Sequence, residues 1–181
     1  MKRSLIASII LAGAGLGSSA TMAQEAVGGS RTPLELVDLS AYFGDAFGPA
    51  NQGDIFDDRF TFTVDNPSGL HLDAMVASIS RSGDTGLDIT GLTLYGANDA
   101  VVTTGQSLRS GAVDLWTVAG NNLAPGDYYL QVTGELLSED SASYAGTMGL
   151  APVPEPATYA LVLGGLGVLG LLAQRRRAKR D

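Results

Sequence analysis

The chain lacks cysteine altogether, and it contains one histidine and one tryptophan among 181 residues. The absence of cysteine excludes disulfides, zinc–thiolate sites and cysteine nucleophiles. A Ser-His-Asp triad would have to use His71, because such a triad needs a histidine as its base. No Gly-x-Ser-x-Gly elbow and no phosphate-binding glycine loop occurs in the sequence. We therefore expect a protein that is not an enzyme and has no cofactor, with His71 as an outward-facing strand residue without catalytic role.

Lysine is absent from residues 24–153, where 17 acidic residues against four arginines leave 13 net negative charges. The whole chain has a formal net charge of only −8, because most of its basic residues lie at the two ends. So acidic a middle repels the phosphate backbone of nucleic acids, and we expect no nucleic-acid partner.

The N-terminus has the three parts of a secretory signal peptide. Two basic residues follow Met1, residues 5–16 are apolar, and small residues precede Ala23. We expect signal peptidase to remove residues 1–23 by cleavage between Ala23 and Gln24, with cleavage after Ala20 as the alternative.

An uncharged apolar run covers residues 157–173 near the other end. At about 1.5 Å per residue, a helix of this length is just long enough to cross a hydrocarbon core. A basic tail, residues 174–181, follows at once and favours a cytoplasmic end, with the acidic domain on the outside of the inner membrane. The basic residues of this tail are Arg175, Arg176, Arg177, Lys179 and Arg180.

Three residues, Pro154, Glu155 and Pro156, precede the apolar run. Together with the glycine-rich helix and the arginine cluster, they make residues 153–181 resemble the PEP-CTERM sorting signal of Gram-negative bacteria. The resemblance implies that an exosortase, a membrane-embedded cysteine protease-transpeptidase, recognises the signal and removes the helix. The three residues would then be substrate residues. Two prolines around one acid keep such a peptide extended and accessible to a protease.

Residues 24–152 contain short segments of alternating polarity separated by turn residues, about eight to fifteen residues apart. This pattern predicts an all-β domain: one antiparallel β-sandwich, jelly-roll-like, between the N-terminal signal helix and the C-terminal transmembrane helix. No amphipathic helix is expected in this domain. The expected strands are Leu34–Leu39, Ile55–Val64, Leu70–Ile79, Leu87–Tyr95, Val101–Thr104, Val113–Val118, Asp127–Thr133 and Tyr144–Leu150.

Asp58 breaks the alternation of one expected strand, because it shares the inward phase of Phe56 and Phe60. A carboxylate that faces a core needs a charged or hydrogen-bonding partner. Either Asp58 binds backbone N–H groups of a neighbouring loop or an arginine, or it binds calcium with Asp54 or Asp57. The sequence has no EF-hand spacing, so no metal site is assigned.

The run from Phe56 to Phe60 resembles the FxDxF motif of a subgroup of PEP-CTERM proteins. Landmarks between residues 56 and 147 are also similar to bacterial pre-peptidase C-terminal (PPC-like) domains, small β-sandwiches of secreted hydrolases. This second resemblance implies only the fold. The glycine-aromatic segment Tyr42–Gly48 is expected to be a loop that plugs one end of the sandwich or stacks on sugar rings.

These observations predict a non-enzymatic exported protein that an exosortase delivers to the cell surface or to an extracellular polysaccharide (biofilm) matrix. Its partners would be signal peptidase, the exosortase, the membrane before processing, and extracellular polysaccharide. The alternative is a carbohydrate- or calcium-binding module that stays anchored in the inner membrane and works in the periplasm. A hydrolase of unknown type is the least supported reading.

Overall fold

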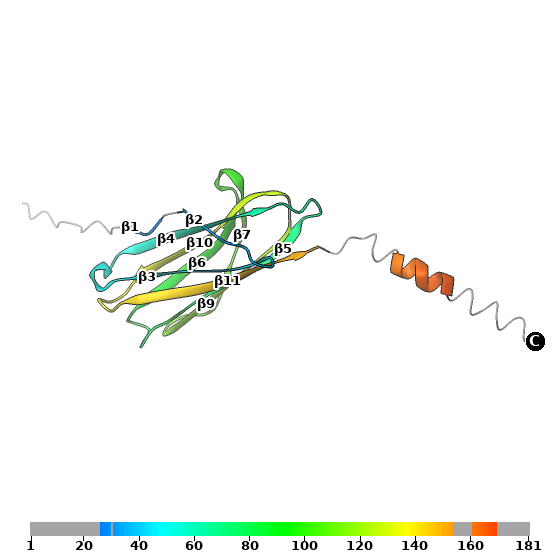
Figure 1. The fold of residues 1–181 in the computed structure, drawn as a ribbon. Helices are drawn as coiled ribbons and strands as arrows, with labels where there is room; N and C mark the ends of the chain where they lie inside the picture. Colours follow the sequence, from blue (N-terminus) through cyan, green and yellow to red (C-terminus); the bar gives the residue numbers. More distant parts are fainter. Residues whose placement is uncertain (1–25, 30, 154–160, 170–181) are drawn as a thin grey trace, which may run out of the picture.

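The computed structural model of the protein describes residues 26–29, 31–153 and 161–169. The first two ranges fold into two β-sheets that lie face to face (Figure 1). Sheet A has the strand order β1-β4-β10-β6-β7, with β2 also beside β4, and sheet B has the order β3-β11-β5-β9-β8. The strands are β1 (Ala26–Val27), β2 (Arg31–Pro33), β3 (Ser40–Phe47), β4 (Ile55–Val64), β5 (Leu70–Ile79), β6 (Leu87–Tyr95), β7 (Val101–Thr104), β8 (Gln106–Arg109), β9 (Val113–Leu123), β10 (Gly126–Leu136) and β11 (Ala142–Pro152).

Most pairs of neighbouring strands in each sheet are antiparallel. The exceptions are β1 and β2, which both run parallel to β4 along the same edge of sheet A. Two short 3-10 turns, η1 (Pro49–Asn51) and η2 (Ala97–Asp99), connect strands. The residues described between 26 and 153 contain no α-helix, in agreement with the predicted all-β domain.

The core lies between the two sheets and follows the period of two that the sequence shows. On β4, Phe56, Phe60, Phe62 and Val64 are all buried, while the residues between them are half-buried or exposed. The facing layer on β5 includes Leu72 and Val76. Burial of these apolar side chains, at about 25 cal/mol per Å² of apolar surface, is the main force that holds the sheets together.

The predicted bounds of β4, β5, β6 and β7 are those of the structure. The expected strands at Val113, Asp127 and Tyr144 are also present, but each is longer than predicted. The short strands β1, β2 and β8 were not predicted. These three have two to four residues each and lack a run of β-branched residues such as the Val-Val-Thr-Thr of β7, so neither alternation nor composition indicates them.

The predicted strand Leu34–Leu39 is wrong. Only Val37 forms an isolated bridge, with Ser40, and Asp38 and Leu39 turn the chain with positive φ values of 49° and 61°. Leu34 and Leu36 pack against the core from outside any strand. Their alternation therefore reflects apolar side chains that cover the core where the chain passes from β2 of sheet A to β3 of sheet B. Leu34 still bonds to β4, through its N–H to the Thr61 carbonyl at 2.8 Å.

The prediction of a loop at Tyr42–Gly48 is also wrong. Most of this segment forms the edge strand β3, in which Phe43 and Phe47 face the core and Tyr42 is 85% exposed. Gly44 interrupts the alternation of apolar and polar residues that would have indicated a strand. It is needed because a side chain there would collide with the backbone of Tyr144 on β11.

A second buried carboxylate, besides Asp58, joins the two sheets. Asp114 on β9 has no exposed surface and accepts hydrogen bonds from the Ser78 hydroxyl (2.9 Å) and from the backbone N–H groups of Gly111 (3.0 Å) and Ile89 (3.3 Å). Ile89 lies on β6 of the opposite sheet. Its carbonyl in turn accepts a hydrogen bond from the indole N–H of Trp116, at 2.8 Å. Asp114 and Trp116 of β9 thus bind the backbone N–H and the carbonyl of Ile89 across the core.

Replacement of Asp114 by alanine should lower the free energy of unfolding by about 2–4 kcal/mol, because buried donors would lose their acceptor. The measurement is urea unfolding of the full chain, followed by the fluorescence of Trp116. The exposed Asp84 provides the matched control, since Asp84→Ala should change stability by less than about 0.5 kcal/mol. Equal effects of the two substitutions would contradict the role assigned to Asp114.

Candidate functional site

The carboxylate of Asp58 lies inside the sandwich, on the inward face of β4. The residue is 4% exposed. Its Oδ2 accepts a hydrogen bond from the Tyr144 hydroxyl at 2.6 Å, and its Oδ1 accepts one from the backbone N–H of Gly29 at 3.3 Å. Tyr144 lies on β11 of the opposite sheet, so this carboxylate joins the two sheets and the N-terminal segment at one point.

The aromatic residues of the motif hold the tyrosine that binds Asp58. Phe56 stacks on Tyr144 with ring centroids 5.4 Å apart, and Phe60 meets the same ring edge-on at 6.5 Å. Phe47 of β3 packs on Phe56 at 4.9 Å. Such aromatic pairs contribute about 0.5–1.5 kcal/mol each beyond their buried area. Phe56, Asp58 and Phe60 therefore act as one structural unit around Tyr144.

Burial and hydrogen bonding act on the pKa of Asp58 in opposite directions. Burial raises this pKa above its ordinary value of 3.8, and the bonds from Tyr144 and Gly29 lower it, with burial the larger effect. The pKa of the Tyr144 hydroxyl is itself strongly raised, by burial and by its bond to the carboxylate. The hydroxyl therefore keeps its proton and remains the donor.

A pair of glycines allows the N-terminal segment to cross over Asp58. Gly28 has a positive φ of 91°, and a Cβ atom on it would collide with Oδ1 of the carboxylate. Gly29 also has a positive φ, of 87°. Only glycine fits both the backbone conformation and the close approach at Gly28. Neither Gly28, Gly29 nor Tyr144 was singled out from the sequence, although a Gly-Gly dipeptide is a turn signal.

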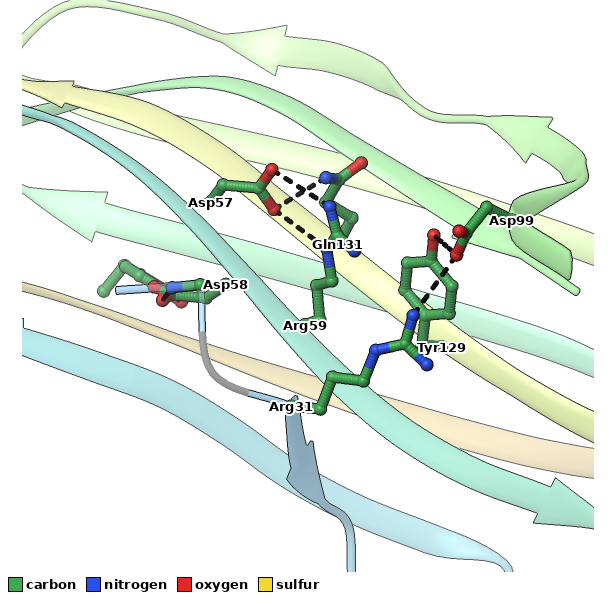
Figure 2. A network of polar contacts seen from close by, with 9 residues as sticks. Arg31, Asp57, Asp58, Arg59, Asp99, Tyr129 and Gln131 are labelled. Atoms are coloured by element: carbon green, nitrogen blue, oxygen red, sulfur yellow. Dashed lines mark hydrogen bonds and ion pairs between the residues drawn. The ribbon is translucent and has the colours of Figure 1, made fainter. Parts of the chain in front are cut away.

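The neighbouring residues of β4 point to the outer surface of sheet A, where they join a polar network (Figure 2). Asp57 accepts hydrogen bonds from Gln131 at 2.6 Å and from Arg59 at 3.4 Å. The guanidinium of Arg59 also lies over the ring of Tyr129, 5.6 Å from its centroid. Asp57 and Asp58 thus lie on opposite faces of the sheet, and the two carboxylates cannot act on one bond.

The same network continues to the turn η2. The Tyr129 hydroxyl donates to Asp99 Oδ1 at 2.9 Å, and Arg31 contacts the same oxygen at 3.4 Å. An open groove of about 720 Å³ lies beside these residues. Its rim includes Asn98 and Asp99, which both have positive φ values near 60°. Its lining also includes Arg31, Leu34, Leu36, Phe62, Asp65, Asp127 and Tyr128.

The other residues considered from the sequence lie apart from this groove. Within the part of the chain that the structure describes, no three histidine or acidic side chains are grouped as metal ligands. Asp54 accepts a hydrogen bond from Asn51 at 3.4 Å, at the turn η1. His71 is half-buried on the outward face of β5, where its Nε2 lies 2.9 Å from Asp73 Oδ2.

The C-terminal signal is described only in part. Pro154, Glu155, Pro156 and the basic tail lie outside the described residues, as do Ala23 and Gln24 at the expected signal cleavage site. Of the predicted membrane span 157–173, residues 161–169 form a helix with exposed side chains. Among the residues that the structure describes, no helix is long and apolar enough to cross a membrane.

Comparison with known families identifies this end of the chain. Residues 152–177 match the PEP-CTERM protein-sorting motif. The motif indicates an exported protein that is sorted by an exosortase toward the cell surface. No curated protein matches the chain.

The hydrogen bond between Tyr144 and Asp58 should stabilise the fold most when Asp58 is charged. Tyr144→Phe removes a donor that lowers the pKa of Asp58, so it should cost about 1–3 kcal/mol of unfolding free energy at pH 7 and less at pH 3. Urea unfolding at the two pH values measures the difference. Tyr42→Phe is the control, because Tyr42 is 85% exposed.

The sign of the wild-type pH dependence follows from the raised pKa of Asp58. As the pH rises above 3.8, the unfolded chain loses this proton before the folded chain does, so the contribution of Asp58 to stability falls with rising pH. Tyr144→Phe should steepen this fall. An equal loss of stability at both pH values would contradict a bond that favours the charged carboxylate.

Proposed function

We propose that this is a non-enzymatic exported protein that an exosortase delivers to the cell surface or to an extracellular polysaccharide matrix. The observation that carries the proposal is the match of residues 152–177 to the sorting motif. Signal peptidase removes residues 1–23, and the apolar run 157–173 holds the chain in the inner membrane until the exosortase acts. The apolar side chains of Leu161, Leu163 and Leu166, more than half exposed on the described helix, support this membrane role.

The surroundings of the only histidine support a protein without catalysis. His71 lies on the outward face of sheet B and contacts Asp73. Neither His71 nor Asp73 lines the groove beside η2. Asp57 and Asp58, the adjacent carboxylates that could have suggested hydrolysis, face opposite sides of β4.

The charge of the exported domain supports a place in a hydrated matrix. Residues 24–153 carry 17 acidic residues against four arginines. Such a charge keeps a protein soluble and lets it associate with other anionic chains through cations. The C-terminal signal would then act only in delivery.

The mature C-terminus tests the sorting proposal. In cells with a working exosortase, mass spectrometry of the accumulated protein should find a chain that ends near Pro154–Pro156 and lacks the tail of residues 174–181. Replacement of Pro154, Glu155 and Pro156 by alanine should leave the tail in place, because the protease would lose its recognition residues. Cell fractionation should then find the variant in the inner membrane.

Pro125→Ala, which changes a proline in the turn between β9 and β10, is the control and should be processed like the wild type. Deletion of the exosortase should give the same result as the triple substitution. An intact wild-type chain in the inner membrane of exosortase-containing cells would overturn the sorting proposal.

The groove beside η2 favours a second function, in which the protein stays anchored in the inner membrane as a carbohydrate-binding module. Its volume of about 720 Å³ lies in the range of small-molecule sites, and its lining combines the ring of Tyr128 with the polar groups of Asp65, Asp99 and Asp127. Calorimetric titration of the full chain with neutral and acidic oligosaccharides tests this function. Heat of binding that Asp99→Ala abolishes would support it, and the absence of heat with either class would exclude it.

A further inference from the structure

The outer face of sheet B differs in charge from the rest of the domain. We define the low-charge face as the outward residues of β3, β11, β5 and β9. In this acidic domain the low-charge face carries one carboxylate, Asp73, and that side chain contacts His71 at 2.9 Å. The outer face of sheet A, in contrast, carries Asp57, Asp88 and Asp127 among others.

Large apolar side chains on this face are exposed. Ile79 and Met75 of β5 are 81% and 45% exposed, and Tyr42 of β3 is 85% exposed. Apolar groups gathered on one face of a soluble domain mark a surface that another molecule covers. Two copies that met through the outer faces of sheet A would bring carboxylates together, whereas the low-charge face offers a surface without that repulsion.

The shape of the low-charge face is complementary to itself. The outward positions of β11 all carry small side chains, and we call this row the trough: Ser143, Ala145, Thr147, Gly149 and Ala151. The neighbouring strand β5 carries a ridge made of Met75 and Ile79. One surface that bears both a ridge and an adjacent trough satisfies the requirement of an isologous interface, in which the same patch serves on both subunits.

We propose that two copies of this chain form a dimer through the low-charge face, with β5 of each copy packed over β11 of its partner. A two-fold axis that runs along the strands, between β5 and β11, produces this arrangement. The same axis places β3 over the partner's β9, so all four strands of the face are covered. An axis across the strands would instead place ridge on ridge.

The size of the face agrees with a weak to moderate dimer. Four strands about 4.8 Å apart and about 30 Å long cover about 600 Å² on each copy. The total of about 1,200 Å² lies at the lower limit of specific protein interfaces. The strand β8, with Arg109, lies outside the covered area.

This axis also fits the position of the sorting motif. Because the axis is parallel to the strands, β11 of both copies runs in the same direction, and both end at Pro152 on the same side of the dimer. The sorting motif begins at this residue. Both copies can therefore present their signals to one membrane, which the alternative axis across the strands would not allow.

The molecular mass of the full chain, isolated in detergent and measured by sedimentation, tests the dimer. The wild type should be a dimer, and Ile79→Glu should weaken association at least about tenfold, because a carboxylate would lose its water in the interface. Ala145→Glu in the trough should have the same effect. Thr104→Glu, at an exposed position of β7 on the outer face of sheet A, is the matched control and should leave the dimer intact.

Because Ile79 is 81% exposed, Ile79→Glu should fold normally, and its circular dichroism spectrum should match that of the wild type. A wild-type chain that is monomeric at about 100 µM would overturn the proposal, and the low-charge face would then be a binding surface for another protein or for a glycan. A dimer that persists in both glutamate variants would also overturn it, because association would then use another surface.

A distance measurement tests the direction of the axis. Since the chain has no cysteine, Pro152→Cys allows one spin label per copy at the exposed end of β11, next to the trough residues and not among them. The proposed axis places the two labelled residues about 10 Å apart, the usual separation of packed sheets, so a short label-to-label distance is expected. A distance above about 30 Å would overturn the proposed axis, because β11 would then run in opposite directions.

Discussion

The carboxylate of Asp58 between the two sheets imposes the constraint on which much of the domain depends. A charged group in a sandwich core is tolerated only if hydrogen bonds replace its water, and here two donors do so from different parts of the chain. Tyr144 supplies one donor, and its ring needs the flanking phenylalanines to hold it. Gly29 supplies the other, and Gly28 must lack a side chain for the segment to approach. One buried acid thereby determines the packing of β4, β11 and the N-terminal segment.

Asp114 repeats this arrangement on the other side of the sandwich, where β9 meets β6. Both acids accept hydrogen bonds from donors of the opposite sheet, and both lie among apolar side chains. The hydrophobic effect has no direction, and the shapes of packed side chains restrict how one sheet can lie over the other. Directional bonds to two fixed carboxylates add to this restriction on the register of the two sheets. The domain thus uses two of its many acidic residues as internal ties and exposes most of the others on its surface.

Sequence patterns predicted the parts of the fold that depend on local alternation. The alternation in β4, β5 and β6 gave their exact bounds, because one face of each strand is buried and the other is not. Alternation failed at Leu34–Leu39, where apolar residues cover the core between β2 and β3, and at β3, where Gly44 interrupts the pattern. The inward direction of Asp58 could be predicted from its phase. Its partner Tyr144 could not, because 86 residues separate the two and no local rule connects them.

The position of the sorting motif explains how processing can leave the domain intact. The last buried residue of β11 is Leu150, and the motif begins two residues later at Pro152. β11 is bonded on both sides, to β3 and β5, and therefore does not need the following residues to hold it. None of the described helix residues 161–169 is buried in the core. Cleavage after the last strand would thus remove the means of delivery without removing any described contact that stabilises the exported domain.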